Sequence, residues 1–155
     1  MKALRHAPWL LLYLLLPCAH AHAQAACPWL TQGTAAAYLQ APVTTFTNLS
    51  SSNEGSCLFT LHQDTATSAL KITVTTTTQP SCPAGKPLTA IGTEATLCSA
   101  HPARNRTTDT VSGRVRNLYF TIELTIIGKT TPPLTPEQRQ SIVQQAAQEV
   151  AGNLF

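Results

Sequence analysis

Residues 70–75 read LKITVT and residues 118–127 read LYFTIELTII. In both stretches apolar side chains alternate with polar ones, which is the period-two pattern of a strand with one buried face. In the longer stretch Phe120 falls on one face, and Tyr119 and Thr121 fall on the other. Both stretches therefore predict strands of a sheet that buries one face and leaves the other face polar.

The segments beside these strands extend the same sheet. Residues 56–62 also alternate, and they are expected to pair with the strand at 70–75 as a hairpin across a polar turn. Residues 110–116 predict a second hairpin with the strand at 118–127. Residues 91–99 add another extended segment, so the pattern predicts about five strands in all.

Three other segments lack a clear strand pattern. Residues 43–55 are rich in Thr, Ser and Asn, and we expect irregular structure there with at most one short strand. Residues 79–87 hold three prolines and a glycine, a composition that interrupts any ladder of backbone hydrogen bonds. Residues 101–109 are polar and contain a proline. We therefore expect a loop at 79–87 and a turn at 101–109.

Two segments carry helix signals. Residues 30–39 contain an Ala-rich run with Thr31 or Thr34 as its N-cap and a proline soon after its end. Residues 135–138 (TPEQ) place Thr at the N-cap, Pro at N1 and Gln at N3, which is a capping-box pattern. Apolar residues then recur every fourth position over residues 142–154, which predicts an amphipathic helix of about 16 residues. The order of elements predicts an α+β domain, with both helices packed on one face of an antiparallel sheet.

Residues 1–23 have the pattern of a secretory signal peptide. Lys2 and Arg5 form a basic start, residues 7–17 form an apolar run, and small residues precede the expected cleavage point. We therefore expect an exported protein, periplasmic or secreted, in which residues 24–155 form a single domain. The apolar run is shorter than the roughly 20 residues of a membrane-spanning helix, so we expect no such helix in the mature chain.

Four cysteines follow the predicted signal peptide, namely Cys27, Cys57, Cys82 and Cys98. An even number in a small exported domain indicates two disulfides, and four cysteines allow three pairings. We favour Cys27–Cys57 and Cys82–Cys98, which tie the first helix to a strand and the Pro-rich loop to its neighbour. A zinc site is disfavoured because no close C-x-x-C pair exists. The residues before Cys27 lack the usual leucine of a lipid-attachment site, so we expect no lipid anchor.

The charge of the chain excludes one class of partner. The full sequence has a formal net charge of +3, and without Lys2 and Arg5 it keeps 8 basic residues against 7 acidic ones. A nucleic-acid-binding domain needs clustered Lys and Arg and a high pI, so we expect no nucleic-acid partner. We also expect no cofactor and no metal.

Catalytic signals are sparse. His62 lies close to Asp64 in sequence, and such a pair could serve as a base with an orienting carboxylate. The chain has no G-x-S-x-G elbow for a serine nucleophile, and its cysteines are expected to be paired. We therefore expect a protein that is not an enzyme, with a small hydrolase that uses His62 as the least favoured alternative.

One set of basic residues is a candidate anion-binding site. Four arginines fall around one predicted turn and strand, and bidentate guanidinium groups that converge could bind a phosphate or carboxylate. The competing interpretation is a solvated surface with Glu94 and Asp109 as counter-charges. The four arginines are Arg104, Arg106, Arg114 and Arg116.

The motif order also carries a resemblance. A cysteine precedes a short Ala-rich helix, and GSCLF (55–59), IGTEA (91–95), GRVRNLYF (113–120) and a C-terminal Ala/Val helix follow. This order resembles small bacterial cell-envelope domains of unknown function that occur in many secreted lipoproteins. It is similar also to the extracellular sensor domains of some actinobacterial receptor kinases. The resemblance implies a curved antiparallel sheet with helices on one face and a cleft, and it implies no catalytic or binding residues.

Together these observations predict an exported, non-catalytic binding or interaction domain of the bacterial envelope. We expect a groove between helix and sheet that strand residues such as Tyr119 and Thr121 line, or a site near the arginine hairpin. The ligand would be an unidentified small molecule or an envelope protein. The alternative is an accessory structural protein of the envelope that acts on one protein partner through an exposed strand edge.

Overall fold

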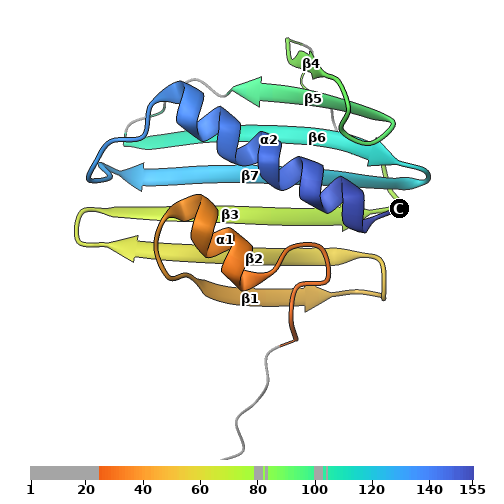
Figure 1. The fold of residues 1–155 in the computed structure, drawn as a ribbon, viewed down its shortest axis with the longest axis horizontal. Helices are drawn as coiled ribbons and strands as arrows, with labels where there is room; N and C mark the ends of the chain where they lie inside the picture. The colour runs from red at the N-terminus through yellow and green to blue at the C-terminus, as the bar shows by residue number, and fades with distance from the viewer. Residues whose placement is uncertain (1–24, 79–81, 83, 100–102, 104) are drawn as a thin grey trace, which may run out of the picture.

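The structure is a computed structural model that describes residues 25–78, 82, 84–99, 103 and 105–155. Within them the chain forms two layers, a seven-stranded sheet and two helices on one of its faces (Figure 1). The predicted signal peptide, His101 and Arg104 lie outside the described residues. Among the described helices, none is both long and apolar enough to cross a membrane.

The sheet is open, and every neighbouring pair of strands is antiparallel, in the order β1-β2-β3-β7-β6-β5-β4. The two predicted hairpins, β2–β3 and β6–β7, are both present, and β3 pairs with β7 to join them at the centre. The strands are β1 (Thr44–Leu49), β2 (Gly55–Gln63), β3 (Ala66–Thr75), β4 (Lys86–Leu88), β5 (Glu94–Ser99), β6 (Arg106–Val115) and β7 (Leu118–Gly128).

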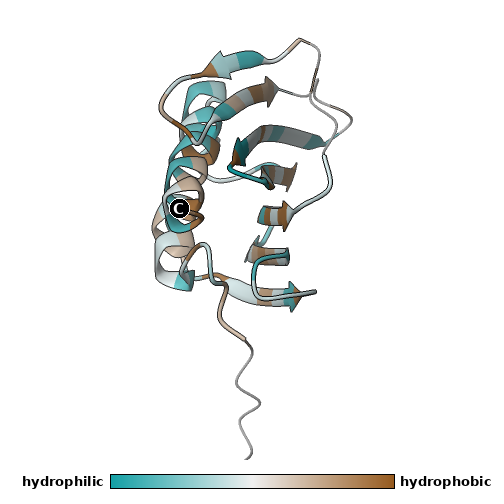
Figure 2. Ribbon diagram, turned by 90° about the vertical axis from the view of Figure 1, so that its right-hand side faces the viewer, coloured by the Kyte–Doolittle hydropathy of each residue, from teal (hydrophilic) through white to brown (hydrophobic). Residues whose placement is uncertain are grey.

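The hydrophobic core lies between the sheet and the helices, as the period-two pattern predicts. Strand residues that alternate along β2, β3 and β7 are fully buried there, among them Phe59, Ile72 and Phe120. The longer helix, α2 (Pro136–Asn153), contributes Val143 and Val150 to the same cluster. Figure 2 shows α2 along one side of the sheet, and neither of the two described helices lies over the other side.

Both helices begin at the caps that their sequences favour. The short helix α1 (Gln32–Leu39) has Thr31 as N-cap, whose hydroxyl accepts a hydrogen bond from the backbone N–H of Thr34. α2 begins after Thr135 with a complete capping box, in which Gln138 also accepts from the backbone N–H of Thr135. The predicted helix start at residues 135–138 is therefore confirmed.

A buried ion pair ties α2 to the sheet. Asp109 is only 1% exposed, and its Oδ2 lies 2.7 Å from Nε of Arg139 in the first part of α2. The Arg139 guanidinium also donates to the backbone carbonyl of Leu134. The turn predicted at residues 101–109 is wrong over its last part, because β6 already begins at Arg106. Asp109 looks like a turn residue in sequence, but its carboxylate has a buried partner that is distant along the chain.

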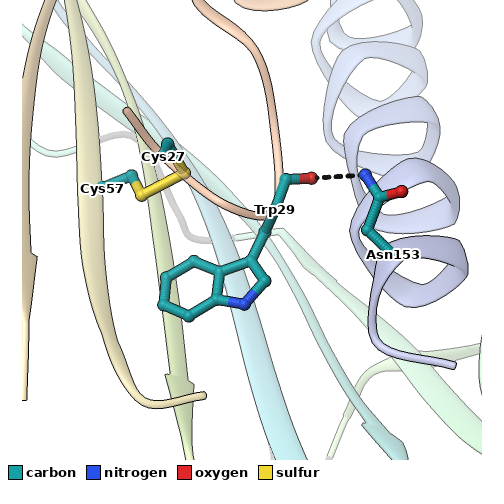
Figure 3. Close-up of a disulfide and its surroundings, with 4 residues drawn as sticks. All are labelled: Cys27, Trp29, Cys57 and Asn153. Carbon is teal, nitrogen blue, oxygen red and sulfur yellow. Dashed lines mark hydrogen bonds between the residues drawn. A yellow bond between two sulfur atoms is a disulfide. The ribbon is translucent and has the colours of Figure 1, made fainter. Parts of the chain in front are cut away.

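Both disulfides have the favoured pairing, Cys27–Cys57 and Cys82–Cys98. Cys57 belongs to β2, so the first bond holds the segment before α1 against the sheet. Figure 3 shows that bond beside Trp29, whose backbone carbonyl accepts a hydrogen bond of 2.9 Å from the Asn153 side chain. The two ends of the described domain are thus joined close to the first disulfide.

The expected number of five strands is wrong, because the sheet has two further strands at its edges. β1 covers six residues of the segment 43–55, where at most one short strand was expected, and its TTFTNL sequence has no apolar alternation because neither of its faces is fully buried. β4 includes Pro87 and so overturns the expectation that residues 79–87 contain no ladder. A proline is tolerated on an edge strand because no strand needs its missing N–H on the outer side.

Candidate functional site

The face of the sheet opposite the helices, here called the outer face, is rich in hydroxyl side chains. The strand registers align one row of them across five adjacent strands, because each is paired with the next. Thr and Ser keep such a face polar without adding charge, since a hydroxyl both donates and accepts hydrogen bonds. The row is Ser56, Thr73, Thr121, Ser112 and Thr96.

A hollow of about 350 Å³ opens over β5, β6 and β7 at one end of this face. Its volume is near the lower limit of small-molecule sites, which span roughly 300–1,000 Å³. We call it the outer-face hollow. Its lining residues are Thr78, Glu94, Ala95, Thr96, Ser112, Gly113, Arg114, Tyr119 and Phe120.

The strand registers place three functional side chains of the outer-face hollow in one row. Glu94 of β5 pairs with Arg114 of β6, which in turn pairs with Tyr119 of β7. Nε of Arg114 donates to Oε1 of Glu94 over 2.7 Å, so the two charges compensate each other. The hollow thus offers an aromatic ring, a charge-compensated donor–acceptor pair and the hydroxyls of Ser112 and Thr96.

Gly113 lies in β6 between Ala95 of β5 and Phe120 of β7. A Cβ atom at Gly113 would lie 2.4 Å from the ring of Phe120 and 2.9 Å from the backbone oxygen of Glu94. The ring of Phe120 therefore occupies the space that a side chain would need, and it supports the sheet beneath the hollow. A glycine at this position permits that close packing.

The three described members of the candidate anion-binding set, Arg106, Arg114 and Arg116, do not converge, and Arg104 lies outside the described residues. Arg106 is the first residue of β6 and Arg114 is the residue before its last. At 3.3 Å per residue, their backbones lie about 26 Å apart. Arg106 lies 4.0 Å from Glu123, whereas Arg116 is in the β6–β7 turn with its guanidinium 5.9 Å from the ring of Phe155. The described arginines therefore contact separate partners instead of converging on one anion.

The two strand residues expected to line a groove between helix and sheet lie on the other face of the sheet. Tyr119 and Thr121 alternate with Phe120 and Ile122, which are fully buried beneath α2. Tyr119 and Thr121 therefore point to the outer face and do not line the space between the layers. Of these two predicted residues, Tyr119 lines the hollow and Thr121 belongs to the neighbouring hydroxyl row.

His62 has the surroundings of an exposed strand residue. It lies near the end of β2, and its Nδ1 is 3.2 Å from the hydroxyl of Thr67 on β3. Asp64 lies in the turn that follows and is not the hydrogen-bond partner of the ring. Within the described part of the chain, no three His, Cys, Asp or Glu side chains come together as a metal site.

A smaller hollow of about 110 Å³ lies beside α1 and contains Tyr38. Burial raises the pKa of Tyr38 to about 12, and the hydrogen bond that its hydroxyl donates to Glu149 adds to the effect. This contact joins α1 to α2, which gives Tyr38 a structural role. The hollow itself is smaller than the usual range for a ligand site.

Part of the outer-face hollow follows from the sequence. The predicted hairpin of residues 110–116 with 118–127 already brings Arg114 close to Tyr119, and the two-residue turn at Arg116-Asn117 makes them direct neighbours because it sets the register. Glu94, Thr96 and Thr78 were missed as site residues. Their placement depends on how β5 pairs with β6 and where the chain runs after β3, and no local pattern specifies either.

No family model, curated protein or solved structure matches this chain. The chemistry of the outer-face hollow therefore carries the functional argument.

Proposed function

We propose that this protein is an exported, non-catalytic ligand-binding domain of the bacterial envelope, and that the outer-face hollow is its binding site. The two disulfides support the exported location, because such bonds persist in oxidising compartments. The resemblance to envelope sensor domains agrees with a binding role.

The observation that carries this proposal is the convergence of Tyr119, the Arg114–Glu94 pair and two hydroxyls on one hollow. A few polar groups beside an aromatic surface are typical of small-molecule sites, where the polar groups orient the ligand. This convergence occurs on a face that no described helix covers.

The charge balance of the hollow favours a neutral ligand. A free arginine would favour an anion, but the guanidinium of Arg114 already donates to a carboxylate. A neutral molecule with many hydroxyls can accept from Arg114, donate to Glu94 and exchange hydrogen bonds with Ser112. Its apolar face can lie against the ring of Tyr119. These features describe a single sugar unit, so we propose a neutral saccharide as the ligand class.

The test is a titration of the disulfide-bonded protein with glucose, N-acetylglucosamine and maltose, in which the backbone amide NMR signals are monitored. We expect at least one sugar to shift the amides of Ser112 and Gly113. Arg114→Gln should weaken that binding at least tenfold, because a hydrogen bond to a charged group contributes about 1.5–3 kcal/mol.

Arg106→Gln is the matched control, because Arg106 lies on the same face of the same strand but outside the hollow. This variant should bind as the original protein does. Equal weakening by both arginine variants would contradict the site, and no amide shift with any of the three sugars would contradict the proposed ligand class.

A further inference from the structure

β1 forms a free edge of the sheet. Within the described residues no strand pairs with its outer side. The N–H of Ser50 donates to the carbonyl of Glu54 in the β1–β2 hairpin. Because backbone groups alternate in direction along a strand, the even-numbered residues of β1 face β2. The N–H and C=O groups of Thr45 and Thr47 therefore point outward.

The outward groups are accompanied by two unsatisfied hydroxyls. The Oγ1 atoms of Thr45 and Thr47 are buried, and neither has a hydrogen-bond partner. Buried polar atoms are ordinarily satisfied, so two neighbouring exceptions on one edge strand require an explanation. Both residues alternate with Phe46, which lies on the outer face and is 60% exposed.

The β1 edge also lacks the usual protection against pairing with another chain. Residues 41–53 contain no Asp, Glu, Lys or Arg. Exposed edges are commonly protected by short length, charge or proline, and the opposite edge of this sheet has all three. There β4 is only three residues long and includes Lys86 and Pro87.

We propose that β1 is a self-association surface, on which the β1 strand of a second copy pairs antiparallel to the first. The pairing has Phe46 opposite Phe46 on the two-fold axis and Thr45 opposite Thr47 on either side. It forms about four backbone hydrogen bonds from the outward groups. It also places Thr45 of each copy opposite Thr47 of the other on the same face, because opposed residues share a face.

The self-complementary chemistry favours a second copy over a different peptide. Two copies of an uncharged strand meet without repulsion, whereas a charged peptide would find no opposite charge in residues 41–53. The register with Phe46 on the axis also joins two aromatic side chains at a non-hydrogen-bonded position. Side chains at such positions approach most closely.

The test measures oligomeric state by sedimentation equilibrium on the disulfide-bonded protein, expressed for export from its full coding sequence. A single strand pair buries little surface, so the concentration range should reach about 1 mM. We expect a reversible monomer–dimer equilibrium. Phe46→Lys and Thr47→Pro should each raise the dissociation constant at least tenfold.

Thr47→Pro removes only an outward N–H, so the monomer should keep its fold by far-UV circular dichroism. Ile127→Lys is the matched control, because Ile127 is also an exposed apolar strand residue but lies in β7. It should leave the equilibrium unchanged. A monomer at every concentration would overturn the proposal, and so would a dimer that both β1 variants leave intact.

Discussion

Replacing Asp109 with alanine tests whether the buried ion pair holds α2 on the sheet. The Asp109 side chain is 2% exposed and that of Arg139 is 16% exposed. The substitution leaves the guanidinium largely buried, where it still donates a hydrogen bond to the backbone carbonyl of Leu134. Removal of one partner of a buried pair costs about 3–5 kcal/mol, because the other charge stays uncompensated.

Urea unfolding monitored by far-UV circular dichroism, with the disulfides intact, measures this loss. At an m value of about 1.5 kcal/mol per M, Asp109→Ala should lower the unfolding midpoint by about 2–3 M. The double variant Asp109→Leu/Arg139→Leu should recover much of the lost stability, because a buried pair replaced by apolar residues is often neutral.

The Glu94–Arg114 pair supplies a matched control with the same nitrogen–oxygen distance of 2.7 Å. Its side chains are 64% and 36% exposed, so solvent screens their attraction. Glu94→Ala should therefore lower the free energy of unfolding by less than about 1 kcal/mol. If Asp109→Ala costs no more than Glu94→Ala, burial does not decide the strength of these pairs and the reasoning fails.

Two further substitutions test the packing of the layers. Since burial raises the pKa of Tyr38 from 10.0 to about 12, the folded state keeps a proton that the unfolded chain loses above pH 10. The stability that this group contributes should be intact below pH 10 and fall as pH rises to 12. Urea titrations of Tyr38→Phe should lack that part of the decline, and an identical decline would contradict the assignment. Gly113→Ala should lower the free energy of unfolding, measured by thermal unfolding, by about 1–3 kcal/mol, because the new methyl group meets the ring of Phe120. Gly152 has open space around it, so Gly152→Ala should not lower this free energy.

The central strands and both helix starts were predictable because their signals are local. The alternation at residues 118–127 depends only on which face is buried, and the capping box at Thr135 depends on residues three apart. The edge strands were harder to predict. β1 has hydroxyl side chains where a central strand has apolar ones, and β4 contains a proline that is tolerated only because the strand is at an edge.

The site was predictable in part for the same reason. The alternation already placed Tyr119 on the polar face, and the hairpin made Arg114 its neighbour. Arg106 and Arg114 do not converge, because residues close in sequence diverge along an extended strand. Asp109 was expected to be a surface counter-charge, but its buried partner Arg139 comes from α2, 30 residues away.

The two proposals have a joint geometric consequence. β1 lies at one edge of the sheet, and the outer-face hollow lies over β5, β6 and β7 in the other half, so pairing through β1 leaves the hollow open. A two-fold axis perpendicular to the sheet keeps both outer faces on the same side of the joined sheet. The two β6 strands are then nine strand positions apart, or about 43 Å at 4.8 Å per step. If both proposals hold, the dimer carries two sites, and a polymeric saccharide long enough to reach both would bind the second site intramolecularly.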